Sequence, residues 1–182
     1  GFSNFRDYRF RKLGRFDYSP QDCTDFHDSI RDEILPLVDQ LYAHRKEGLG
    51  LPELRPCDLH VDTSGQSPLR PFKNMDDLVQ KASVCLQRVH PQFGDVLRQM
   101  REMGHLDLDS RPGKRPGGYN MPLLLTGVPF IFMNASRSLG DMRTLLHECG
   151  HAVHSYLTRD LPLSFTRRVP SEVAELADMS ME

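Results

Sequence analysis

Cysteine and tryptophan are scarce in this sequence, which has four cysteines and no tryptophan in 182 residues. The cysteines form no Cys-x-x-Cys pair, which argues against a disulfide framework or an all-cysteine zinc site (Cys23, Cys57, Cys85 and Cys149). The formal net charge is only −2, so there is no electrostatic reason to expect nucleic acid or an anionic membrane as a partner. No apolar run approaches the roughly 18 residues of a membrane span. We therefore expect reduced thiols in a cytoplasmic protein.

The length and the two ends of the chain bear on its domain organisation. With 38% hydrophobic residues among 182, the chain can bury one sizeable core, so it is one domain or part of one. It begins at Gly1 without an initiator methionine and stops at Glu182, partway through a predicted helix. We therefore expect a fragment of a longer protein.

Residues 1–104 are predicted to be a mainly helical region. Ser19 precedes a proline, as is typical of a helix start, and apolar residues then repeat at helical spacing to about Gly48. Pro36 is expected to kink this helix. The rest of the region is predicted to be an extended connection followed by two helices (51–72, 74–90 and 92–103).

The pattern changes in residues 105–182. The glycine- and proline-rich stretch at 111–120 is predicted to be a loop, and 127–134 a short apolar strand. Helices are predicted at 140–158 and from Pro170-Ser171 onward. This order indicates a mainly α protein with a small β-sheet, of the α+β class.

The predicted helix at 140–158 contains "LLHECGHAVHSYL", an HExxH motif. His147 and His151 are four residues apart and so lie on one face of a helix, where both rings can reach one zinc ion. Glu148 is placed to take a proton from a water molecule as general base without being a ligand. The simpler interpretation is a solvated helix face that carries histidines. His154 lies near the same face and is more typical of a core or supporting histidine than of a further ligand.

A catalytic zinc site needs a third protein ligand. The metzincin pattern is excluded, because His154 stands where that pattern has glycine and Leu157 where it has histidine. A glutamate on the last helix is the other common solution, and Glu175 forms an acidic stripe there with Asp178 and Glu182. Such a stripe is usually a solvated face, and spacing alone does not choose between Glu172 and Glu175.

Four stretches, "GKRPGGY", "GVPFIFMN", "HECGHAVHSYLTRDLP" and "PSEVAELADMSME", follow one another as in a known family. In them the chain resembles the thimet oligopeptidase and oligoendopeptidase F family of zinc peptidases, and it is closer to the oligoendopeptidase F branch. The N-terminal "NFRDYRFRKLGRFDYSPQDC" and "LPELRPCDL" extend the resemblance over essentially the whole chain. One departure is Cys57, where the family leads us to expect tryptophan.

The resemblance implies roles for five residues. His147 and His151 match the two zinc histidines, Glu148 matches the catalytic glutamate, and Glu175 matches the third ligand. Glu182 matches an acidic position expected to orient a zinc histidine by hydrogen bonding. Residues that stabilise the oxyanion are expected outside this fragment, which by itself should be weakly active or inactive.

The resemblance implies that residues 1–182 are part of one zincin-like catalytic domain, with one zinc ion and short peptides as substrates. We expect 127–134 to be the edge strand that pairs with the peptide, which makes Val128 and Phe130 candidate substrate residues; an ordinary core strand is the alternative. Gly117 and Gly118 are expected to let the peptide approach the backbone closely; a plain loop is the alternative. The rival hypotheses are a non-catalytic peptide-binding or scaffold module, and a peptidase that processes organelle presequences.

Overall fold

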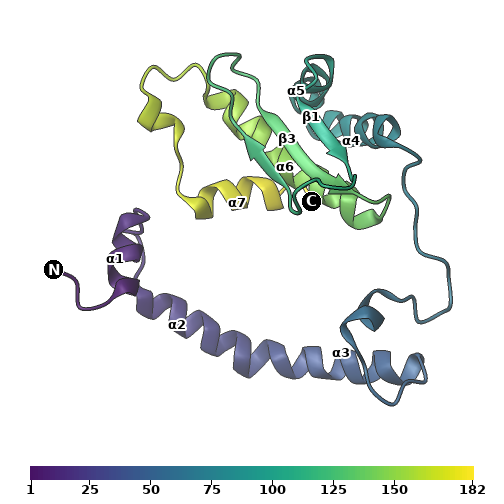
Figure 1. Ribbon diagram of the computed structural model, residues 1–182. Coiled ribbons are helices and arrows are strands. Elements are labelled where there is room, and N and C mark those ends of the chain that lie inside the picture. The colour runs from purple at the N-terminus through teal and green to yellow at the C-terminus, as the bar shows by residue number, and fades with distance from the viewer. The chain divides into compact units, whose positions relative to one another are not determined.

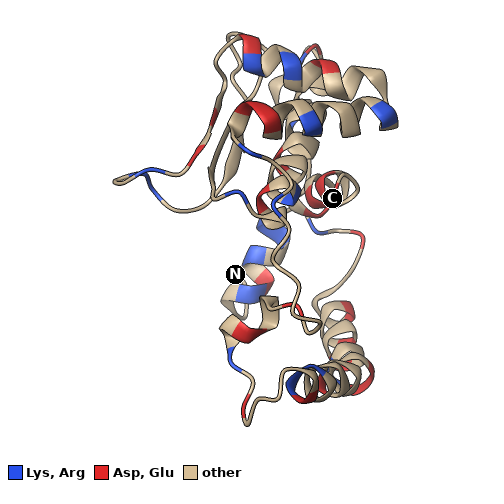
Figure 2. Cartoon of the chain, turned by 90° about the vertical axis from the view of Figure 1, so that its right-hand side faces the viewer, with Lys and Arg blue, Asp and Glu red and all other residues tan.

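The computed structural model describes residues 1–182, which form two compact units, Gly1–Pro68 and Leu69–Glu182. The two helices that follow Pro68 belong to the second unit, because they pack with the C-terminal part of the chain. Acidic and basic residues are mixed along most of the helices, whereas α2 and α7 contain acidic residues but no lysine or arginine (Figure 2). No helix is both long and apolar enough to cross a membrane.

The first unit is built on one long helical segment. Ser19 caps its start through a capping box with Asp22, as the sequence predicts. Where Pro36 removes a backbone donor, the helix contains a π-helical turn, so the expected disturbance is a change of hydrogen-bonding pattern. No residue of this segment is buried. The elements of the unit are α1 (Phe5–Lys12), α2 (Pro20–Ser29), the π-helical turn η1 (Ile30–Ile34), α3 (Leu35–Gly48) and the 3-10 helix η2 (Pro56–His60).

The second unit contains the sheet and the remaining helices, which confirms the prediction of a mainly α protein with a small sheet (Figure 1). Helix α6 packs against β2 and β3, against the α4–α5 pair and against α7. The elements are α4 (Met75–Val89), α5 (Pro91–Glu102), β1 (Leu106–Asp109), β2 (Tyr119–Met121), β3 (Phe130–Ala135), α6 (Leu139–Thr158), η3 (Ser164–Arg167) and α7 (Ser171–Met179).

The three strands are arranged in the order β1-β3-β2, with β1 parallel and β2 antiparallel to β3. Both sides of β3 are therefore paired: Ile131 is opposite Leu106 on one side and Asn120 on the other. The expectation that 127–134 forms an edge strand is wrong, and the alternative of a core strand holds. The strand with a free edge next to α6 is β2, and its first two residues lie in the stretch that the sequence predicts to be a loop.

The core lies between the sheet, α6 and the α4–α5 pair. Leu78, Met100, Ile131 and Leu145 each have an exposed fraction of 0%. Cys149 is also buried, and burial raises the pKa of its thiol, as expected for an inert cysteine. This packing holds α6 firmly under the sheet and leaves its histidine-bearing side toward α7.

A buried lysine fixes the segment that leads into β2. The Lys114 ammonium donates to the backbone oxygens of Asp107 (2.9 Å), Asp109 (2.8 Å) and Met133 (2.5 Å) and to the Asp107 carboxylate (3.0 Å). It also lies 4.4 Å from the centre of the Phe132 ring. Four acceptors and an aromatic face offset the cost of burying this charge. The lysine therefore ties the 110–118 loop to β1 and β3.

Candidate metal centre

Helix α6 presents the two histidines of the HExxH motif on one face. Ser138 begins the helix by accepting from the Asp141 N–H (3.2 Å), while the Asp141 carboxylate accepts from the Ser138 N–H (2.7 Å). One turn separates His147 from His151, and their ring centres are 5.2 Å apart. The helical spacing therefore brings both rings to the same place, as the sequence predicts.

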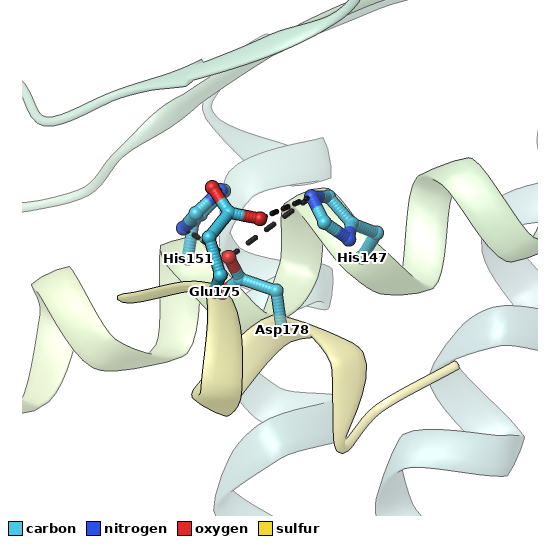
Figure 3. Close-up of side chains that lie close together, drawn as sticks. All are labelled: His147, His151, Glu175 and Asp178. Atoms are coloured by element: carbon cyan, nitrogen blue, oxygen red, sulfur yellow. Dashed lines mark ion pairs between the residues drawn. The ribbon is translucent and has the colours of Figure 1, made fainter. Parts of the chain in front are cut away.

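Helix α7 brings two carboxylates to these rings. Glu175 and Asp178 lie with His147 and His151 so that one ligand atom from each is within 4.8 Å of all the others (Figure 3). Spacing in the sequence left Glu172 and Glu175 as alternatives, and the cluster contains Glu175. Residues of two helices thus form one compact group of possible ligands.

Each histidine has a carboxylate close to its Nδ1 atom: Glu182 forms a hydrogen bond with His147, whereas Asp178 makes a close ion-pair contact with His151 without hydrogen-bond geometry. Glu182 lies 2.8 Å from Nδ1 of His147, and Asp178 lies 2.5 Å from Nδ1 of His151. The Nε2 atoms of the two rings are 3.7 and 4.0 Å from the Glu175 carboxylate. A carboxylate at Nδ1 favours the tautomer that carries its proton there, which leaves the Nε2 lone pair available. Both lone pairs are then available beside the Glu175 carboxylate.

The arrangement fits a zinc ion. Two atoms that bind one zinc at about 2.0–2.2 Å and at a tetrahedral angle are about 3.3–3.6 Å apart. The separations of 3.7 Å from His147 Nε2 to Glu175 Oε2 and 4.0 Å from His151 Nε2 to Glu175 Oε1 are slightly longer, so a small contraction would bring the three groups to zinc-binding distance. Burial lowers the pKa of His151, which favours the neutral ring that a metal requires. Three protein ligands with an open fourth position are typical of a catalytic site.

The carboxylate of Asp178 is the most buried of the group, with an exposed fraction of 0%. Burial raises its pKa to about 6, and the nearby Glu175 adds to this, while the charge of His147 opposes it. Its backbone lies directly against Gly150 of α6: a Cβ placed on that glycine would be 2.5 Å from the Asp178 Cα. The close approach of α7 to α6 therefore depends on a glycine at position 150.

Glu148 lies on the sheet side of the cluster. Its exposed fraction is 6%, and its Oε2 is buried without a hydrogen-bond partner. Burial raises its pKa, partly opposed by the charge of His147 and by a hydrogen bond from the Asn120 backbone N–H. A Cβ on Gly118 would be 3.4 Å from Oε1 of Glu148, so this glycine also lies against the carboxylate. A carboxyl group with a raised pKa beside possible metal ligands is suited to exchange protons.

A hollow of about 440 Å³ opens above these residues. It is lined by the metal cluster, by Glu148 and Ser155 of α6 and by β2 with its neighbours (Gly118, Tyr119, Asn120, Pro122, His147, Glu148, His151, Ser155 and Glu175). A short peptide could therefore lie between the free edge of β2 and the cluster.

Four residues named from the sequence lie elsewhere. Val128 has an exposed fraction of 3% and belongs to the core, and Phe130 is in the central strand, so neither offers a free strand edge to a peptide. Gly117 precedes the hollow and has a φ of 104°, which marks it as a turn residue. His154 is not among the clustered ligands, although its charge contributes to lowering the pKa of His151.

Sequence reasoning missed two residues of the site. The sequence places Asp178 in the acidic stripe of the last helix, and its spacing does not distinguish it from a solvent-exposed residue. Asn120 lines the hollow with a buried side-chain nitrogen that has no hydrogen-bond partner. The sequence predicts a loop at this position, because a three-residue strand leaves little periodicity in a sequence.

Fold and site together define a mainly α protein whose candidate metal centre combines an HExxH helix with a glutamate from the following helix. Residues 1–182, the entire chain, match Peptidase family M3. The chain belongs to this family, which confirms the resemblance seen in its sequence. Members of the family are metallopeptidases.

Several bacterial peptidases are similar in sequence. An oligoendopeptidase F homologue of Lactococcus lactis is 30% identical over 166 residues, or 91% of this chain and 27% of that protein. The oligopeptidase PepF of Bacillus subtilis is 31% identical over 141 residues, or 77% of this chain and 20% of that protein. The chain thus spans about a quarter of the length of these relatives.

Solved structures show the same fold. PZ peptidase A with an inhibitor superimposes with a TM-score of 0.90 at 28% identity, over 100% of this chain and 32% of that one. An oligoendopeptidase F structure from Bacillus anthracis gives a TM-score of 0.90 at 26% identity, over 100% and 33%. The likeness covers both compact units.

Proposed function

We propose that this chain is the metal-binding part of a zinc-dependent oligoendopeptidase that hydrolyses peptide bonds in short oligopeptides. The observation that carries the proposal is the approach of two imidazole Nε2 atoms to the Glu175 carboxylate beside a buried Glu148. Because the chain covers only part of its relatives, the activity, the substrates and the cytoplasmic location of the whole protein are all part of this proposal. The four free cysteines support a reducing compartment.

His147, His151 and Glu175 would hold one zinc ion, with Glu182 and Asp178 fixing the orientation of the two rings. When bound, zinc would polarise the scissile carbonyl and lower the pKa of a water molecule to about 7. Glu148 takes a proton from the attacking water and passes it to the leaving amine. Its raised pKa suits this task, because the acid form must also donate near neutral pH.

The peptide would pair with the free edge of β2 and lie across the hollow. Tyr119 and Asn120 line the hollow from this strand, and Gly118 lets a substrate approach Glu148 without meeting a side chain. Strand addition binds the backbone of any sequence, which is suited to an enzyme for varied short peptides.

The test is Glu148→Gln in the full-length protein. The variant keeps the size of the side chain and removes the base, so kcat should fall by about 10²- to 10⁴-fold while zinc content is unchanged. Peptide hydrolysis and metal analysis, with and without a chelator, give the two readings.

Unchanged kcat in the variant would contradict the role of Glu148. A wild-type protein that binds zinc and peptides but cleaves none would instead favour the non-catalytic scaffold.

A further inference from the structure

A second hollow, of about 330 Å³, adjoins the one above the metal cluster. The two share Pro122 and Ser155 in their linings. The second is enclosed by the 122–129 segment, the end of α6 and the start of the connection to α7, with Arg159 and Arg167 among its lining residues. A peptide bound over the cluster could therefore continue into a space lined by two arginines.

Helix α6 sets the distance between the two hollows. His151, Ser155 and Arg159 follow one another at intervals of four residues, so they lie along one ridge of the helix. Eight residues at a rise of 1.5 Å each correspond to about 12 Å along the axis. An extended peptide covers about 3.3 Å per residue, so Arg159 is about three or four residues away from the bond over the metal cluster.

Arg159 is held in a defined position. Its guanidinium lies 3.4 Å from the centre of the Tyr156 ring, and Nη1 donates to the Tyr156 carbonyl oxygen (3.1 Å). The nearest carboxylate, that of Asp160, is 3.6 Å from Nε and has an exposed side-chain fraction of 87%. The stacked side chain has lost most of its freedom before any ligand binds, which reduces the entropy cost of binding.

Arg167 supplies a second positive charge. Its Nε donates to the Leu161 carbonyl oxygen (2.9 Å). Arg159 has a structural explanation as well, because a cation at the C-terminus of α6 stabilises the helix dipole. That explanation does not extend to Arg167, which lies on the following connection. Two guanidinium groups against one exposed carboxylate leave the hollow with a net positive charge.

We propose that the hollow lined by Arg159 and Arg167 is a subsite that binds a carboxylate of the peptide substrate. The inference rests on the proposed function and adds a preference to it: substrates that place a carboxylate three or four residues from the scissile bond are cleaved more efficiently. Arginine binds carboxylates through paired hydrogen bonds, which makes it better suited to this task than a single point charge. The carboxylate can be an acidic side chain or the C-terminus of a short peptide.

The experiment compares matched fluorogenic peptides on the zinc-loaded full-length protein. One series carries Glu or Gln at each position from two to five residues on either side of the cleaved bond. The other carries a free or amidated C-terminus at the same distances. At the favoured position kcat/KM should be about 10-fold higher for the acid, which corresponds to one charge-assisted hydrogen bond, and the ratio should fall with added salt. The series that shows the ratio identifies the source of the carboxylate.

Variants connect the preference to the two arginines. In Arg167→Gln and in Arg159→Gln the acid-to-amide ratio should fall toward one. Arg168→Gln is the matched control, because Arg168 is exposed and does not line the hollow. A ratio of one in the wild type at every position, or a ratio retained in both variants, would overturn the subsite. Absence of all peptide hydrolysis would instead overturn the proposed function.

Discussion

The carboxylate of Asp178 is fully buried and lies 2.5 Å from Nδ1 of His151. Without metal, the raised folded-state pKa of about 6 means that the folded protein binds more protons than the unfolded chain between about pH 4 and 6. The wild type should lose stability over this window, whereas Asp178→Asn carries no charge to bury. We therefore expect the metal-free variant to gain stability relative to the wild type as the pH rises from 4 to 7.

Denaturant unfolding in the presence of a chelator, at several pH values, measures this difference. The same substitution should have the opposite effect on zinc affinity. Asp178→Asn removes the carboxylate that orients His151, so it should weaken zinc binding by about 10- to 100-fold. Asp160→Asn, at an exposed position, is the control. A stability difference that does not change with pH would show that Asp178 is not buried in its charged form.

At the scale of single residues, the sequence predicts the two histidines of the site, but it does not predict which carboxylate contacts which ring nitrogen. His147 and His151 are found together because helical spacing is a local property. The crossing of α6 and α7 decides which carboxylates lie at the Nδ1 atoms of the histidines, here Glu182 and Asp178. It also decides which carboxylate lies near the Nε2 atoms, here Glu175. That crossing is set by side chains far apart in the sequence, so the acidic stripe alone could not show which carboxylate does what.

The contact between α6 and α7 depends on Gly150. A Cβ at this position would be 2.5 Å from the Asp178 Cα and 3.1 Å from the Ala177 carbonyl oxygen, so the helices would have to separate. Gly150→Ala should therefore destabilise the protein by about 1–3 kcal/mol through overpacking, although alanine is the better helix former by about 1 kcal/mol. Zinc affinity should fall with it. Chemical denaturation and a zinc competition assay measure the two effects.

Gly140 offers a matched control in the first turn of the same helix. A Cβ there would meet only the Ser138 hydroxyl, at 3.5 Å, which is an ordinary contact. Gly140→Ala should be neutral or stabilising and should leave zinc binding unchanged. Equal losses in the two variants would show that the effect comes from glycine in a helix and not from the α6–α7 contact.

Among the elements, helices were predicted well and strands poorly. The helices that follow Ser19 and Asn74 begin where the sequence predicts, because a cap acts within a few residues, and α6 begins one residue before its predicted start at 140. The strands β1 and β2 have only four and three residues, and pairing with β3 is what defines them. Pairing partners are non-local, which is why the edge was assigned to the wrong strand.

Over the whole molecule, burial is concentrated in the second unit. Leu145 of α6 is fully buried, whereas Leu176 and Met179 of α7 have exposed fractions of 69% and 65% and so have few packing partners. Leu145→Ala should destabilise the chain by about 2–5 kcal/mol. Leu176→Ala should change its stability by no more than about 0.5 kcal/mol.

Equilibrium unfolding at two protein concentrations tests both values. A large loss for Leu176→Ala would show that the outer face of α7 is covered in solution, and a dependence on concentration would identify the cover as another copy of the chain.

The proposed ligands come from two helices, α6 and α7. The first ligand, His147, and the last, Glu175, are 28 positions apart in the sequence. A metal ion bound by His147 and Glu175 would close the segment between them into a loop, as a disulfide does. An ion that stayed bound during unfolding would restrict the conformations of the unfolded chain. For a loop of that length the chain-entropy argument gives about 3–4 kcal/mol. The ion proposed for this site would then also act as a removable cross-link between α6 and α7, and its removal should loosen the attachment of α7.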